Sequence, residues 1–417
     1  MRSHSLLAVA TLGAVTAVAL SSPASQAVGA TFTVVDSTVN GSELNVGVSP
    51  NGNIFVGGWD AIGRSTDDGA TWTRHATTPA VTFAADRVLI VDKDTGRVLV
   101  NDTTLGCTIL SWSDDDAATW QTNPAACGGG VTDHQKIAVG KRVTFTDPTG
   151  TLYPNLIYVC ANGLSHTDCG VSSDGGRTFV PVGVHGVGCA FQGTPVTGVD
   201  GAIYEPTSQC GLHVRISRDN GLTWTEHAVG FASQSDTPDV AVTPDGTIYL
   251  AYIDANWKPA LARSTDGGVT WTGPYAVTVP GLVSGLFPSI VAGADGRIAV
   301  SFTGTTDSTS GWDLNPGNAP GSVQWHGYVA VVTDAAAATP TIAPAQVTSH
   351  PLQYGGLSKL GASLNNIADY ADIDVGPDGR VYAVFMDGCL PGCTSQAQST
   401  SSRGVVAIQT GGDDLLP

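Results

Sequence analysis

The stretch Asp236–Trp271, DTPDVAVTPDGTIYLAYIDANWKPALARSTDGGVTW, contains the features from which the fold of this chain is predicted. Apolar residues alternate at Val240 and Val242, which is typical of a strand with one buried face. A Pro-Asp-Gly turn separates this strand from a second one, Ile248–Ile253, which is rich in β-branched and aromatic residues. A third strand is predicted at Ala260–Arg263.

The stretch ends in the octapeptide Ser264–Trp271, which has the form S-x-D-x-G-x-T-W. An Asp in a turn accepts hydrogen bonds from main-chain N–H groups, and Gly adopts positive φ without steric cost, so the octapeptide predicts a turn between strands. Its Trp then buries a large ring on the outer strand. Further copies stand at Ser65–Trp72, Ser113–Trp120 (with Ala117 in place of Gly), Ser172–Phe179 and Ser217–Trp224. The aspartates predicted to be structural in these turns are Asp67, Asp115, Asp174, Asp219 and Asp266.

Strand-turn-strand units also recur along the whole chain. They are found at Val46–Trp59, Asp86–Asn101, His134–Cys160, Thr194–Glu205, Pro288–Thr303 and Ala371–Phe385. With the opening stretch they make seven repeats of roughly 45–60 residues, the period of propeller blades. We therefore predict an all-β fold, a seven-bladed β-propeller of four-stranded antiparallel blades, with six blades as the alternative.

The octapeptides resemble the Asp-box repeat of the sialidase (neuraminidase) superfamily and of related bacterial propellers. The resemblance covers the chain from residue 31 to residue 417, which we predict to be one domain. It implies a propeller with the boxes on the blade periphery, away from the active site. It also implies a carbohydrate-related activity.

The two ends of the chain predict export and ring closure. Residues 1–30 combine Arg2, the short apolar run Leu6–Leu20 and small residues suited to cleavage, which is the pattern of a secretory signal peptide. We expect a secreted protein. Because blade seven lacks one strand at the C-terminus, Phe32–Val35 is predicted to supply its outer strand and close the ring.

Composition narrows the range of partners. The formal net charge is −18 over 417 residues, which argues against nucleic acid and against an anionic membrane surface. We expect an extracellular glycan or polysaccharide as the partner, and a monomer. No cofactor and no metal site are predicted, although a calcium ion ringed by carboxylates in the channel stays an open alternative.

Eight cysteines in an exported chain predict disulfides. Proximity within single repeats favours the pairs Cys107–Cys127, Cys160–Cys169, Cys189–Cys210 and Cys389–Cys393. The rival interpretation, a zinc site with His166, fits no common zinc spacing.

Four tryptophans outside the octapeptides map to the loops of one propeller face: Trp59, Trp257, Trp312 and Trp325. Aromatic rings among carboxylates and amides are a familiar setting for sugars. Trp59, Trp257 and Trp312 are therefore candidate ligand-binding residues, together with Arg87 and His134 at the starts of inner strands. The alternative is that these rings only fill the top of the channel.

Catalytic candidates follow from the resemblance. Sialidases use a Tyr assisted by a Glu as nucleophile and a loop Asp as acid/base. Tyr204 and Glu205 alternate faces on one strand, so Tyr370 with Glu205 is the version that this chain allows, with Asp133 as the acid/base. One departure weakens this assignment: sialidases hold the sialate carboxylate with three arginines, and the Arg-Ile-Pro or Arg-Val-Pro segment that carries the first is absent here.

Three hypotheses therefore stand. The first is a glycoside hydrolase-like, glycan-cleaving propeller. The second is a non-catalytic propeller that binds a glycan or a protein. The third is a polysaccharide lyase, for which His134 and Tyr370 would be the candidates.

Overall fold

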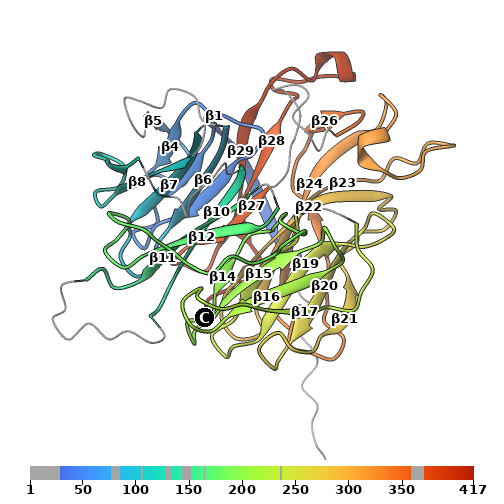
Figure 1. Cartoon of the computed structure of the whole chain (residues 1–417). Coiled ribbons are helices and arrows are strands. Elements are labelled where there is room, and N and C mark those ends of the chain that lie inside the picture. Colours follow the sequence, from blue (N-terminus) through green and yellow to red (C-terminus); the bar gives the residue numbers. More distant parts are fainter. Residues whose placement is uncertain are drawn as a thin grey trace, which may run out of the picture.

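The computed structural model describes residues 29–76, 85–104, 107–124, 126, 133–142, 152–163, 165–234, 237–357 and 371–417. These residues form seven antiparallel sheets, and Figure 1 shows them arranged around one axis, with the colour of the chain advancing from blade to blade. The predicted seven-bladed propeller is confirmed, and the six-bladed alternative is wrong. The predicted signal peptide lies almost entirely outside the described residues.

Each blade has four strands, numbered outward from the channel. Blade 1 contains β2 (Asn45–Val48), β3 (Ile54–Gly57), β4 (Ile62–Ser65) and β5 (Thr73–His75); blade 2 contains β6 (Ala85–Val91), β7 (Val98–Thr104), β8 (Cys107–Ser113) and β9 (Gln121–Asn123). Blade 3 contains β10 (Asp133–Gly140), β11 (Leu156–Asn162), β12 (Thr167–Ser172) and β13 (Val180–Pro181); blade 4 contains β14 (Val196–Thr197), β15 (Ile203–Thr207), β16 (His213–Ser217) and β17 (Thr225–Ala228).

Blade 5 contains β18 (Asp239–Val242), β19 (Ile248–Ile253), β20 (Pro259–Ser264) and β21 (Thr272–Ala276). Blade 6 contains β22 (Ser284–Ala292), β23 (Ile298–Thr305), β24 (Gln324–Val332) and β25 (Ala345–Gln346), and the short β26 (Gln353–Tyr354) also pairs with β24. Blade 7 contains β27 (Asp372–Val375), β28 (Val381–Asp387), β29 (Arg403–Gly411) and β1 (Thr31–Asn40). Two short 3₁₀ helices, η1 (Pro316–Asn318) and η2 (Gln396–Gln398), lie in loops.

Burial between blades explains the strand sequences. The second strand of a blade is covered on both faces by its neighbours, so β19, with the sequence IYLAYI, is buried at every position. The hairpin from β18 to β19 turns at Gly246, whose φ of 84° would be strained for a residue with a side chain. Apolar side chains from adjacent blades pack together, as in the cluster that combines Tyr249 of β19 with Phe302 of β23. The core is therefore a series of inter-blade layers around the channel.

The octapeptides form one repeated turn. In the copy of blade 5, Asp266 accepts hydrogen bonds from the Thr270 main-chain N–H (2.9 Å) and hydroxyl (2.6 Å), and the Ser264 hydroxyl donates to the same carboxylate (2.8 Å). The Ser264 oxygen in turn accepts from the N–H of Gly268 (2.9 Å). The same bonds recur around Asp67, Asp115, Asp174 and Asp219. These five carboxylates serve the turns.

The ring closes through the N-terminal strand, as predicted. β1 pairs antiparallel with β29, from Phe32 opposite Gln409 to Asp36 opposite Val405, and forms the outer strand of blade 7. In Figure 1 the blue β1 lies beside the red strands of the C-terminal blade. Closure gives the last blade the strand it lacks, so no blade edge is left unpaired at the junction.

Three of the predicted disulfides are present: Cys160–Cys169, Cys189–Cys210 and Cys389–Cys393. The fourth, Cys107–Cys127, falls outside the described side chains. Within the described ranges, none of the helices has the length and apolar character needed to cross a membrane.

Candidate functional site

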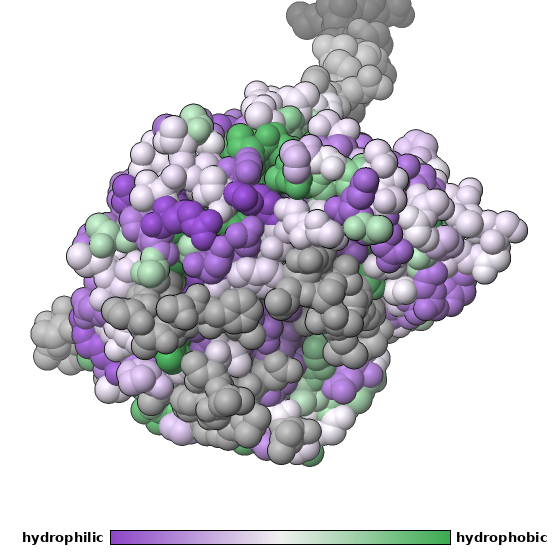
Figure 2. All heavy atoms as spheres, turned by 90° about the horizontal axis from the view of Figure 1, so that it is seen from above, coloured by the Kyte–Doolittle hydropathy of each residue, from purple (hydrophilic) through white to green (hydrophobic). Residues whose placement is uncertain are grey.

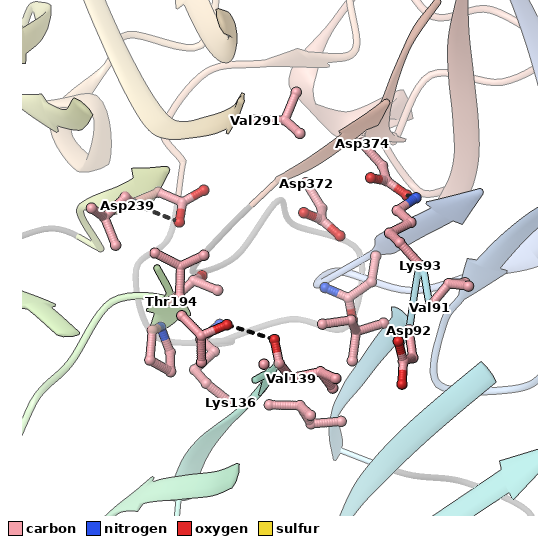
Figure 3. A pocket seen from close by; sticks show the side chains of 18 of the residues that line it. Val91, Asp92, Lys93, Lys136, Val139, Thr194, Asp239, Val291, Asp372 and Asp374 are labelled. Atoms are coloured by element: carbon pink, nitrogen blue, oxygen red, sulfur yellow. Dashed lines mark hydrogen bonds and ion pairs between the residues drawn. The ribbon is translucent and has the colours of Figure 1, made fainter. Parts of the chain in front are cut away.

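A cavity of about 640 Å³ occupies the central channel. Its walls come from the inner strands of all seven blades, and Figure 3 shows side chains from several of them around one opening. The volume lies within the range of small-molecule sites, which is about 300–1,000 Å³. Its apolar wall consists of aliphatic residues, among them Val91, Val139 and Val291. The channel is therefore the principal concave site that the described residues form.

The charged lining is mixed, with an excess of carboxylates. Ammonium groups come from Lys93, Lys136 and Lys141, and carboxylates come from Asp92, Asp94, Asp239, Asp372 and Asp374. Three of the five lysines in the chain therefore lie here. Sequence reasoning did not select them. The rarity of Lys, together with the position of three of them in or directly after inner strands, is the signal that could have indicated them.

Several polar residues at the starts of inner strands join neighbouring blades. Asp239, the first residue of β18, accepts hydrogen bonds from the Ser289 hydroxyl (2.7 Å) and the Ile290 N–H (2.9 Å) of blade 6. Asp372, the first residue of β27, accepts from the Val46 N–H of blade 1 (3.0 Å). These side chains satisfy N–H groups at the edges of the inner strands, and they also line the cavity.

Burial shifts the titration of both carboxyl groups. It raises the pKa of Asp239 to about 6, despite the opposing effects of its hydrogen bonds and of Lys136. Burial also raises the pKa of Asp372 well above its usual value, and the nearby carboxylates of Asp239 and Asp374 add to the effect. Two acids with raised pKa values on one cavity are a feature of functional sites, although inter-blade bonding also produces it.

Glu205, predicted to be catalytic, is fully buried on β15. Its carboxylate lies 2.9 Å from Arg215 Nη1 and 2.9 Å from His185 Nε2. Burial alone would raise the pKa of Glu205, but His185 and Arg215 outweigh it and lower that pKa. His185 in turn stacks on Trp224 at 3.9 Å between ring centroids. Glu205 therefore lies in an ion-pair cluster outside the channel lining, and its catalytic role stays a prediction.

The other two catalytic candidates cannot be placed beside it. Tyr370 lies outside the described residues, and for Asp133 only the backbone is described, as the first residue of β10 opposite Asn162. The predicted constellation of Glu205, Asp133 and Tyr370 remains a hypothesis.

The ligand-binding candidates Arg87 and His134 are both buried. Arg87 is held by Asp102 at 2.6 Å and by the carbonyl of Gly58 at 2.7 Å. His134 stacks on Phe191 at 4.6 Å, and burial, followed by the charge of Lys136, lowers its pKa well below the usual value. Neither residue is among those that line the channel cavity.

The three candidate tryptophans are half-buried. Trp59 lies in the turn between β3 and β4, and Trp257, with φ of 60°, lies in the turn between β19 and β20. Trp312 packs against the core, donates its indole N–H to the Asn315 carbonyl (2.9 Å) and meets Trp325 edge-on. Trp325, which was expected on the face, is instead fully buried and donates to the Gly355 carbonyl. Its position on a strand between packed blades explains the difference.

The arginines do not form a carboxylate clamp in the channel. No Arg is found among the described residues that line the cavity. All twelve arginines beyond Arg2 bond to protein groups elsewhere: Arg64, Arg74, Arg87, Arg97, Arg142, Arg177, Arg215, Arg218, Arg263, Arg297, Arg380 and Arg403. The channel therefore lacks, in its described part, the group that would hold a sialate carboxylate.

Among the described residues, the only set of His, Cys, Asp or Glu close enough to share a metal ion is Cys160, Cys169 and Glu205. The two sulfurs form a disulfide and the carboxylate is already paired, so this set does not suit a metal. The expectation of no resident metal, with channel calcium as the alternative, remains a prediction.

The surface is polar on the face seen in Figure 2, where hydrophobic residues form small patches and hydrophilic ones predominate among the described residues. Such surroundings suit a polar ligand better than an apolar one.

No family model matches this chain, and no curated protein matches it. Solved structures do. A protein of unknown function from Dyadobacter fermentans is 14% identical over 93% of this chain and 99% of its own, with a TM-score of 0.46. The intramolecular trans-sialidase of Ruminococcus gnavus, solved with oseltamivir carboxylate, is 13% identical over 88% of this chain and 94% of its own, with a TM-score of 0.42.

A third similar structure is that of the Aleuria aurantia lectin with α-methyl-L-fucoside, which is 13% identical over 77% of this chain and 96% of its own, with a TM-score of 0.45. The structural neighbours thus include sialidases and a lectin. At such low identities and TM-scores, the likeness decides neither the ligand nor the activity of this chain.

Proposed function

We propose that this protein is a secreted propeller that recognises an extracellular glycan in its central channel. The observation that carries the proposal is the cavity of about 640 Å³, which combines aliphatic walls with carboxylates and ammonium groups from several blades. Sugars match such a lining because they present C–H faces together with hydroxyl groups, and carboxylates accept hydrogen bonds from hydroxyls. The disulfides and the predicted signal peptide support a place outside the cell.

Recognition without cleavage of sialosides is favoured by the arginines. A sialidase needs cationic forks at the carboxylate of its substrate, and every arginine beyond Arg2 bonds to the protein, away from the described channel lining. The Asp-box resemblance supports a carbohydrate ligand without requiring catalysis.

The test combines glycan binding with a channel block. Calorimetry or a glycan array would measure binding of the purified mature protein, and the variant Val291→Trp would fill the cavity. The control Val269→Trp places the same ring on a residue that is half exposed, on the turn of blade 5. We expect binding to survive in the control and to be lost in Val291→Trp. Equal binding by both variants would exclude the channel, and no binding by the wild type would overturn the proposal.

One observation favours a second function, glycoside hydrolysis. Asp239 lines the cavity with a pKa of about 6 near a second carboxyl, Asp372, and a protonated acid next to a carboxylate is the arrangement that glycosidases use. Release of reducing sugar from any neutral or acidic glycan, abolished by Asp239→Asn in folded protein, would establish this function. Absence of release alongside measurable binding would exclude it.

A further inference from the structure

The charges that line the channel are unbalanced in favour of negative groups, and most of the positive charge is already engaged. Lys93 lies 2.5 Å from Asp374 and donates to the Val48 carbonyl at 2.6 Å. Lys136 is buried at the side of the cavity, where its charge favours the ionised form of Asp239. Lys141 is the cation that lies exposed at the cavity.

Two of the carboxylates keep unused acceptor positions. A carboxylate has about four lone-pair sites for hydrogen bonds. Asp372 accepts one bond on each oxygen, from the N–H groups of Val46 and Ile373. Asp239 accepts two on one oxygen and one, from Val240, on the other. In Figure 3 both side chains border the same opening. A ligand in the cavity can therefore still bond to both groups.

The electrostatics of the channel favour a cation at that place. Ionised Asp239 and Asp372 repel each other in a site that is poorly hydrated, which is part of the reason that the Asp372 pKa is raised. A positive charge between them would remove this repulsion. The formal net charge of −18 would also draw cations toward the protein and slow the approach of anions.

We infer that the channel selects a glycan that carries protonated amino groups, with the ammonium placed between Asp239 and Asp372. The inference rests on the proposed function and narrows it: a glucosamine oligomer is the expected class, whereas neutral and uronate glycans are disfavoured. Binding should also release protons. Near pH 5.5 the free carboxyls are largely protonated, and an ammonium beside them stabilises their ionised forms.

Isothermal titration calorimetry at about pH 6 would compare a glucosamine tetramer with the matched N-acetylglucosamine tetramer. We expect at least about tenfold tighter binding of the amine form, the effect of about 1.4 kcal/mol. Titration in buffers of different ionisation enthalpy should show proton release for the amine form and none for the acetylated form.

Matched variants assign the effect to the channel. Asp372→Asn keeps an acceptor for the Val46 N–H and removes the charge, so it should weaken the amine form about tenfold and leave the acetylated form within about twofold. Asp200→Asn removes the same charge from a half-exposed residue paired with Arg218 outside the cavity lining, and it should leave both affinities unchanged. An equal loss in both variants would mean a general charge effect and would overturn the inference.

The outcomes separate the inference from the proposed function. Equal or tighter binding of the acetylated tetramer would overturn the inference alone. Binding of spermidine without binding of any glycan would overturn both, as would failure of the folded protein to bind every ligand tested.

Discussion

Lys93 Nζ lies 2.5 Å from Asp374 Oδ2 across the junction where the propeller ring closes. Lys93 follows β6 in blade 2, Asp374 belongs to β27 in blade 7, and the ammonium also donates to the Val48 carbonyl of blade 1, which lies between them. One side chain therefore ties three blades together at the channel. The same Asp374 oxygen accepts the Val48 N–H at 2.7 Å, so charge and main-chain bonding support each other at the seam.

Removal of this tie should loosen the seam. Lys93→Met should lower the free energy of unfolding by about 1 kcal/mol, a modest value because the lysine side chain is 45% exposed and water screens the pair. Urea unfolding would measure it. The control is Lys141→Met, which removes an exposed ammonium that makes no hydrogen bond to the described residues, and it should change stability little. If the control were as destabilised as Lys93→Met, the tie would not be the cause.

Asp239 should make stability depend on pH. Its pKa is about 6 in the folded protein and 3.8 in the ordinary case, so the folded state binds the proton more tightly. The stabilisation is complete below about pH 4 and is lost as the pH rises through 6, and it amounts to about 3 kcal/mol. Asp239→Asn should remove this dependence. Unfolding free energies of both proteins at pH 4.5 and 7.5 test it, and the wild-type protein should gain relative to the variant at the lower pH. A constant difference would refute the assignment.

Glu205 should matter for stability. Glu205→Gln leaves Arg215 buried without its anionic partner, so we expect a loss of about 3 kcal/mol. Glu226→Gln, which changes the half-exposed second partner of the same arginine, should lose less than about 1 kcal/mol. Chemical denaturation measures both. Similar small losses would show that the buried pair is not a structural element, which would reopen the predicted catalytic role.

The octapeptide glycine should be sensitive to a single methyl group. Gly221 has φ of 86°, and a Cβ there would lie 2.9 Å from Val182 Cγ2, so Gly221→Ala should cost about 1–2 kcal/mol. In the degenerate copy, Ala117 adopts φ of 66° with its methyl buried, so Ala117→Gly relieves backbone strain but loses packing and should be close to neutral. Thermal unfolding of the two variants should show this asymmetry. A neutral Gly221→Ala would contradict it.

The disulfides should contribute according to the loop that each one closes. Cys189 and Cys210 are 21 residues apart, so replacing both by Ser should cost about 3 kcal/mol. Cys389 and Cys393 are only 4 residues apart, and the corresponding loss is about 2 kcal/mol. Denaturation of the two double variants compares them. The reverse order would mean that contacts of the loops, and not chain entropy, dominate.

The repeated octapeptides and strand-turn-strand units determined the fold, because each is a local pattern whose turn chemistry and two-residue period depend only on neighbouring residues. The closing strand could also be predicted, since a blade with three strands must find a fourth. The three disulfides followed from proximity within a repeat.

Tertiary structure alone decided the site. Asp239, Asp372 and Lys93 come from blades far apart in the sequence, and only ring closure places them on one cavity. Likewise Glu205 and Trp325 lie on strands whose ends suggested an exposed face, yet packing between blades buries both. A period of two tells which strand face a residue occupies, but it does not tell whether a neighbouring blade covers that face. That depends on the whole ring.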